Sequence, residues 1–164
     1  MTTATIENNI IEVIAERLRE FTEANGYDYD AAGVVRPDKR GEEWTVEHRL
    51  MLVDVASIAR DPEHDRPGNP PAVAYTMTVE ARMILRSGMT NDAVDSSEAF
   101  YAAAVMKKLI ATGSQWWQFD NNAYNADIGE PNPFRAQTGD YSGVTVPITV
   151  WFRVSENNPF QSRS

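Results

Sequence analysis

The sequence predicts an α+β fold: a mostly antiparallel sheet with two helices packed on it and a long extended hairpin arm. Segment 6–25, and a second segment that starts at residue 93 or 96 and runs to 112, repeat apolar residues at steps of three and four, the spacing of an amphipathic helix. Segments 44–58, 73–85 and 144–154 alternate along their length or are apolar on both faces, as strands are. The order of helix, strands, helix and strands favours an antiparallel or mixed sheet with the helices on one face.

Both predicted helices have residues suited to their ends. Thr5 is a residue type that caps helix N-termini, and Gly26 tolerates the left-handed backbone that ends a helix. The second helix should stop at Gly113, while Asp95 and Glu98 have the spacing of a capping box. Its apolar side is predicted to consist of Phe100, Ala103, Val105, Met106, Leu109 and Ile110.

The predicted strands differ in their surroundings. Segment 44–58, with Trp44, Val46 and His48 on one face, is apolar on both faces from residue 50 and so indicates an inner strand. Segment 73–85 exceeds the usual five or six residues, which predicts an arm that extends past the core. Segment 144–154 contains Pro147, which has no N–H to donate, so we expect an edge strand or a bulge there. A short strand or arm is expected at Val34-Val35.

Composition limits the class of protein. The 164 residues suit one domain, predicted over residues 1–155, with a polar tail at 156–164. The sequence has no cysteine, which removes disulfides and cysteine-based metal sites. We expect no signal peptide, because no cationic region precedes an apolar run at the start of the sequence, and no membrane span, because no apolar run approaches about 18 residues. The net charge of −9 predicts repulsion of nucleic acid, since phosphate binding needs local Lys and Arg.

Residues 59–71 form a predicted exposed connection, rich in proline and charge, that carries a candidate acidic loop. This acidic loop consists of Asp61, Glu63 and Asp65, with His64 among them. Oxygen ligands suit a hard cation, but the spacing matches no calcium or magnesium loop, and a solvated loop is the alternative. Asp120-Asn121-Asn122 begins like an EF-hand loop, but Tyr124 occupies the fifth position. No motif predicts a catalytic, cofactor or metal site.

Aromatic residues are concentrated after the second helix. A short strand is expected at residues 116–119, and a loop at 120–140. One interpretation is that the two tryptophans cover the core between sheet and helix. The other is that part of the group anchors a protein interface, where Trp and Tyr are over-represented. The candidate interface residues are Trp116, Trp117, Phe119, Tyr124 and Phe134.

The order of these elements resembles that of the tail terminator proteins, also called tail-completion or neck proteins, of long-tailed bacteriophages. The resemblance covers nearly the whole chain and consists of a pattern of elements rather than a signature motif. It is carried by the helix 6–25 before Gly26-Tyr27, the strand 50–55, the Pro-rich charged connection, the strand 73–85, the helix to Gly113 and the strand 144–154.

The resemblance implies a structural virion protein that is not an enzyme and uses no cofactor. Such proteins assemble in the host cytoplasm into rings, commonly hexamers, that cap the tail tube and meet the head connector. The implied partners are other copies of the chain, the tail tube protein and the head-connector or neck proteins. DNA would pass without specific binding, repelled by Asp61, Glu63 and Asp65 lining the channel. Another neck, head-completion or tail-tube subunit and, less favoured, a small enzyme stay open as alternatives.

Overall fold

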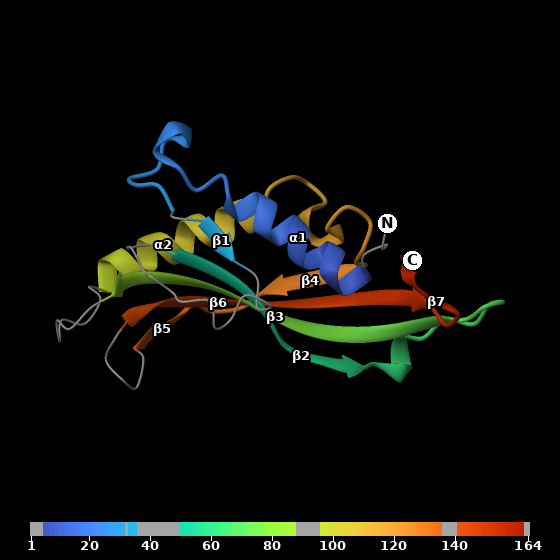
Figure 1. Cartoon of the computed structure of the whole chain (residues 1–164). Helices are drawn as coiled ribbons and strands as arrows, with labels where there is room; N and C mark the ends of the chain where they lie inside the picture. Colours follow the sequence, from blue (N-terminus) through green and yellow to red (C-terminus); the bar gives the residue numbers. More distant parts are fainter. Residues whose placement is uncertain (1–4, 32, 36–49, 88–95, 136–140, 163–164) are drawn as a thin grey trace.

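The computed structural model describes residues 5–31, 33–35, 50–87, 96–135 and 141–162. Within these ranges two helices pack on a mostly antiparallel sheet, which confirms the predicted α+β fold (Figure 1). The elements, in chain order, are α1 (Ile6–Leu18), β1 (Gly33–Val35), β2 (Leu50–Arg60), β3 (Ala72–Ser87), α2 (Ser96–Ile110), β4 (Asn125–Ile128), β5 (Asn132–Arg135), β6 (Tyr141–Ser155) and β7 (Asn158–Ser162). Short 3₁₀ turns are η1 (Glu23–Asn25), η3 (Pro62–His64) and η4 (Trp116–Gln118).

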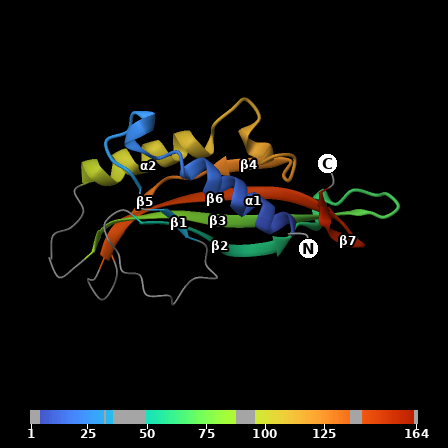
Figure 2. The ribbon, with the colours of Figure 1, turned by 45° about the horizontal axis from the view of Figure 1, so that its top comes forward.

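The sheet is built around the long pair β3 and β6. Its order is β1-β2-β3-β6-β4, and β5 and β7 also pair with β6. Only β1 and β2 run parallel among the paired strands described; the other pairs are antiparallel. The core lies between this sheet and the two helices, as Figure 2 shows, where both helices lie over the same face.

Helix α1 begins as predicted but ends earlier. The Thr5 hydroxyl accepts a hydrogen bond from the Asn8 amide, and the apolar stripe of the helix is buried. The helix ends at Leu18, whereas the apolar spacing predicted helix to residue 25. Phe21 is fully buried although it lies beyond the helix, and its ring stacks on Tyr29 at 5.2 Å. Burial of that ring continues the stripe without continuing the helix.

Helix α2 differs from the prediction on one face. Ala103, Val105, Met106, Leu109 and Ile110 are buried, as predicted, but Phe100 is 57% exposed. At 100° per residue, Phe100 lies on the side opposite to the buried residues, so it is not part of the apolar side. Gly113 has φ of 95° just after the helix. The predicted cap residue Asp95 lies outside the described residues.

The prediction for Pro147 was wrong, because β6 is an inner strand. The Pro147 carbonyl accepts from the Gly129 amide on the β4–β5 side. In a strand the N–H and C=O of one residue point to the same side, so the missing donor of Pro147 also faces that side. There the neighbouring strand is interrupted, because β4 ends at Ile128 and β5 begins at Asn132. The break between two short strands lets proline sit inside the sheet.

Segments outside the main elements differ in part from the prediction. The predicted strand at 116–119 is the turn η4, and Phe119, Asp120 and Asn121 all have positive φ. The predicted loop 120–140 contains β4 and β5, and the tail contains β7. The connection 59–71 includes the end of β2 and η3. Trp44, Val46 and His48 lie outside the described residues.

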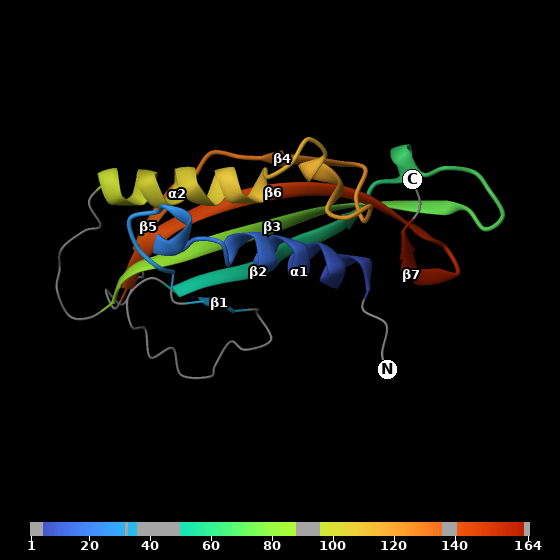
Figure 3. The ribbon, with the colours of Figure 1, turned by 90° about the horizontal axis from the view of Figure 1, so that it is seen from above.

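Strands β2 and β3 form a long hairpin, and its closed end projects from the molecule. In Figure 1 and Figure 3 the connection between the two strands extends beyond the ends of both helices. Most of the hairpin is part of the central sheet, so the predicted arm is confirmed only for its end. Residues 62–69 are exposed there. We call residues 58–74 the hairpin tip.

Candidate functional site

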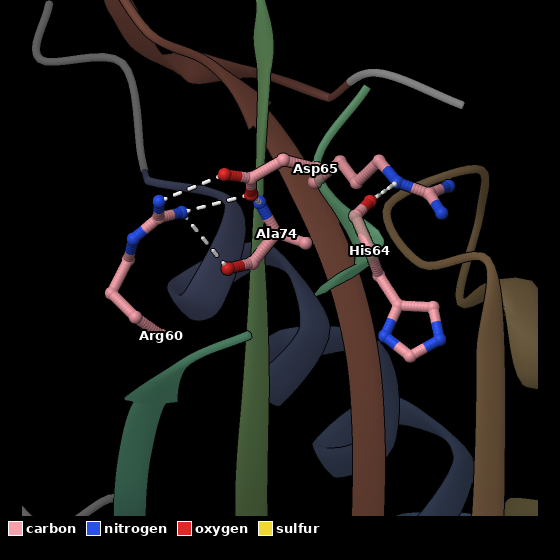
Figure 4. A network of polar contacts seen from close by, with 5 residues as sticks. Arg60, His64, Asp65 and Ala74 are labelled. Carbon is pink, nitrogen blue, oxygen red and sulfur yellow. Dashed lines mark hydrogen bonds and ion pairs between the residues drawn. The ribbon is translucent and has the colours of Figure 1, made fainter. Parts of the chain in front are cut away.

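The hairpin tip is held together by one carboxylate. Asp65 accepts hydrogen bonds from both Arg60 terminal nitrogens, at 3.0 and 2.9 Å, and from the Ala74 amide at 2.7 Å (Figure 4). Arg60 also donates to the Ala74 carbonyl at 3.2 Å, and its guanidinium lies 5.4 Å from the Tyr75 ring centroid. These contacts join the end of β2, the residue after η3 and the start of β3, so the projecting tip has a defined shape.

A second arginine ties the tip to the sheet. Arg153 on β6 is 6% exposed and donates from Nε to the His64 carbonyl at 2.7 Å. Its guanidinium carbon lies 3.8 Å from the centroid of the Tyr124 ring. His64 Nδ1 in turn lies 2.7 Å from Asp61 Oδ2. The turn η3 is therefore held to β6 through the His64 carbonyl and to the preceding residue Asp61 through the His64 ring.

These contacts shift the pKa values of the groups involved. The hydrogen bond with Arg60, with a further contribution from the Ala74 amide, lowers the pKa of Asp65 below its usual range. The same pair raises the pKa of Arg60. Burial raises the pKa of Tyr124, while the nearby charge of Arg153 opposes that rise. The ionised form of Asp65 is therefore favoured over that of a free aspartate.

The three acidic residues of the predicted loop have different surroundings. Asp65 and Asp61 point into contacts within the tip, with Arg60 and His64 respectively. Glu63 is exposed, and the structure shows no hydrogen bond or ion pair for it among the described residues. The sequence predicts these residues as one channel-lining set, and that stays a prediction. Within the subunit, Asp61 and Asp65 also hold the tip together, and Glu63 is an exposed carboxylate.

The aromatic group predicted as an interface is divided by the fold. Phe119 is fully buried, and Trp116 packs against the core with its ring 6.2 Å from Phe119. Trp117 is half-buried beside Trp116, at 6.3 Å. Tyr124 stacks with Arg153, as described above. Phe119 and Trp116 therefore serve the core, which agrees with the first interpretation for one of the two tryptophans.

Phe134 lies far from the rest of the group. It is on β5 opposite Gly143, whereas the Tyr124 amide bonds to the Trp151 carbonyl on the same strand β6. Eight residues of strand separate those two positions on β6, which corresponds to roughly 27 Å. A single aromatic interface made of all five residues is therefore not formed within one subunit.

Arg17 links the aromatic turn to both helices. Its Nη1 donates to the Ile110 carbonyl at the end of α2, at 2.7 Å, and to the Trp116 carbonyl at 3.0 Å. The guanidinium lies 5.1 Å from the Phe119 ring centroid. Burial lowers the pKa of Arg17, and the charge of Asp120 partly offsets this. No pattern in the sequence indicates this role, because Arg17 stands among other charged residues on the polar face of α1.

Sequence reasoning also missed two exposed apolar side chains. Among the described residues, the large apolar side chains that are exposed are Phe100 at 57% and Ile58 at 45%. Ile58 is paired with Met77, a core residue, so it shares the helix-bearing side of the sheet but lies near the projecting end. A helical projection of α2 would have identified Phe100 as lying outside the buried face.

No known protein-family model matches this chain, and comparison with curated protein sequences finds no significant relative. Within the described ranges, no group of three or more His, Asp or Glu side chains is placed to hold a metal ion. None of the helices described is long and apolar enough to cross a membrane.

Proposed function

We propose that the protein is a structural subunit that assembles with copies of itself into a closed ring. More particularly, we propose that it is a tail terminator of a long-tailed bacteriophage, which caps the tail tube and joins it to the head connector. The order of elements that suggested this family in the sequence is present as helices and strands in the fold. The proposal places the protein in the virion and gives it no enzymatic role.

The observation that carries this proposal is the hairpin tip. It projects beyond both helices, yet two arginine-centred networks keep it ordered (Figure 4). An exposed loop that only connects two strands needs no such fixing, because a flexible connection costs little in stability. A rigid projection is useful for contact with a neighbour, since less conformational entropy is lost when it docks.

The test is the native mass and shape of the purified protein. We expect sedimentation velocity and native mass spectrometry to show one discrete oligomer, and negative-stain images to show rings with a central opening. Long tubes would favour the alternative of a tail-tube protein. An 18 kDa monomer at every concentration up to the millimolar range would contradict a ring subunit.

A further inference from the structure

We propose that the hairpin tip of one subunit docks on the outer face of α2 of the next subunit, so that Ile58 meets Phe100 and Glu63 meets Lys107. This inference rests on the proposed ring and identifies its two contacting surfaces. Both surfaces lie on one chain, and the occupant of each is therefore a second copy of the protein.

The receiving surface is a stripe along the outside of α2. At 100° per residue, the residues on this side lie within about 80° of each other, opposite the buried face. They are Ser97, Phe100, Ala104, Lys107 and Ala111. Small side chains flank an exposed aromatic ring, and the charged member is a lysine. On a chain with a net charge of −9, this apolar and cationic stripe differs from the average surface.

The inserting surface is the hairpin tip. Ile58 is 45% exposed near the end of β2, and the exposed Glu63 follows in η3. The charge of Arg60 is neutralised by Asp65, with which it forms a two-point ion pair. The tip therefore offers an apolar side chain followed by an outward-facing carboxylate on a backbone that is already fixed.

The two surfaces match in chemistry and in spacing. From Ile58 to Asp61 the chain advances about 10 Å. The turn η3 sets Glu63 at most about 4 Å further on, a difference that the long side chains of Glu63 and Lys107 can span. Phe100 and Lys107 are separated by two helical turns, which is also about 10 Å. An apolar contact can therefore form beside an ion pair between Glu63 and Lys107, and opposite charges on the two surfaces favour that register.

The positions of the surfaces determine the type of assembly. Figure 1 and Figure 3 show that the first turn of α2 and the β2–β3 connection lie at opposite ends of the molecule. A contact between two different surfaces is heterologous, and repeated head to tail it produces a ring or an open filament. Because neither surface can reach the other within one subunit, each must be met by another copy, and in a ring each chain then has two neighbours.

Charge reversal tests the ion pair. We expect Glu63→Lys and Lys107→Glu each to weaken association by about tenfold, measured by sedimentation velocity at low salt, because like charges then face each other. The double variant E63K/K107E should regain most of the affinity. The matched control combines Lys107→Glu with Glu130→Lys, an exposed acid in the β4–β5 connection, and should not regain it.

Cross-linking tests the apolar contact directly. Since the chain has no cysteine, Ile58→Cys and Phe100→Cys introduce the only thiols. With a short bismaleimide, the variant that carries both should give a ladder of covalent oligomers, and each single variant should remain uncrosslinked. The control pair Phe100→Cys and Glu130→Cys should give no ladder.

The outcomes separate this inference from the proposed function. Discrete rings without a ladder, or charge reversals that the double variant does not rescue, would overturn the inference and leave the ring intact. A double-cysteine product that stops at the dimer would show a two-fold contact and overturn it as well. If Glu63→Lys leaves association unchanged but creates salt-sensitive binding to duplex DNA, the tip faces a DNA channel instead. A monomer at all concentrations would contradict both proposals.

Discussion

Asp65 shows how a single side chain sets the shape of the hairpin tip. Its carboxylate receives Arg60 from β2 and the Ala74 amide from β3, so both strands are anchored at one point. Its pKa is lowered in the folded protein, mainly by Arg60. A group with a lowered folded pKa stabilises the fold at pH values above its unfolded pKa, and this contribution is lost as the pH falls through the folded pKa. The contacts of Asp65 should thus stabilise the tip at neutral pH, and this stabilisation should be lost in acid.

Replacement of Asp65 tests this at the level of one amide. We expect Asp65→Ala to reduce the hydrogen-exchange protection of the Ala74 amide at neutral pH, because that amide loses its acceptor. Protection of the Val79 amide, in the middle of β3, should stay unchanged. Glu63→Ala is the matched control and should affect neither amide. In the natural protein, protection of the Ala74 amide should decrease once the pH is lowered below the usual pKa range of aspartate. Equal protection at Ala74 in all variants would show that the carboxylate does not organise the tip.

At the scale of secondary-structure elements, the Arg17 side chain contacts three separate parts of the fold. It connects α1 to the end of α2 and to η4 through two carbonyls, and its guanidinium packs on Phe119. The last carbonyls of a helix have no partner within the helix, so a donor from elsewhere satisfies them. This contact aligns the two helices against each other above the sheet.

We expect Arg17→Met to lower the free energy of unfolding by about 1–3 kcal/mol, because the Ile110 and Trp116 carbonyls lose a charged donor in a partly buried place. The methionine keeps much of the apolar stem in contact with Phe119. Urea unfolding followed by tryptophan fluorescence gives the measurement. Arg19→Met, at an exposed position just after α1, should change it by less than about 0.5 kcal/mol. Equal losses at the two positions would contradict the role given to Arg17.

Periodicity is the reason that the main elements could be predicted. The buried faces of α1, β3 and β6 follow the spacings of helix and strand, so their positions were evident from the sequence. Strand β4 could not be predicted in this way, because Asn125 and Asp127 are disfavoured in strands and pairing with β6 imposes the conformation. Pro147 was misplaced for a related reason, since the break that accommodates it lies in a different segment of the chain.

The candidate site depended even more on tertiary structure. Glu63 and Asp65 were correctly located at exposed positions, whereas Asp61 is partly buried. Their contacts with Arg60 and His64, and the support from Arg153, come from pairings across strands that no local pattern indicates. Exposure of Phe100 was predictable from the helical projection. Its proposal as a contact surface also required the position of the hairpin tip at the opposite end of the molecule, which only the tertiary structure shows.

For the whole molecule, a head-to-tail contact predicts complementation between two defective subunits. Phe100→Glu places a carboxylate in the α2 stripe but leaves the hairpin tip intact. Ile58→Glu disables the tip but leaves the stripe intact. Each variant alone lacks one of the two required surfaces, so each should associate at least about 30-fold more weakly than the natural chain.

Mixed in equal amounts, the two variants should form a dimer and nothing larger. The intact tip of the Phe100→Glu subunit can dock on the intact stripe of the Ile58→Glu subunit. The remaining stripe and tip are both blocked, so growth stops after one contact. Sedimentation velocity of the mixture gives the species, and urea unfolding of each variant checks that these exposed positions leave the fold stable. Asn125→Glu, on exposed β4, should still assemble fully. Full rings from either variant alone, or a mixture that stays monomeric, would show that the subunits meet through other surfaces.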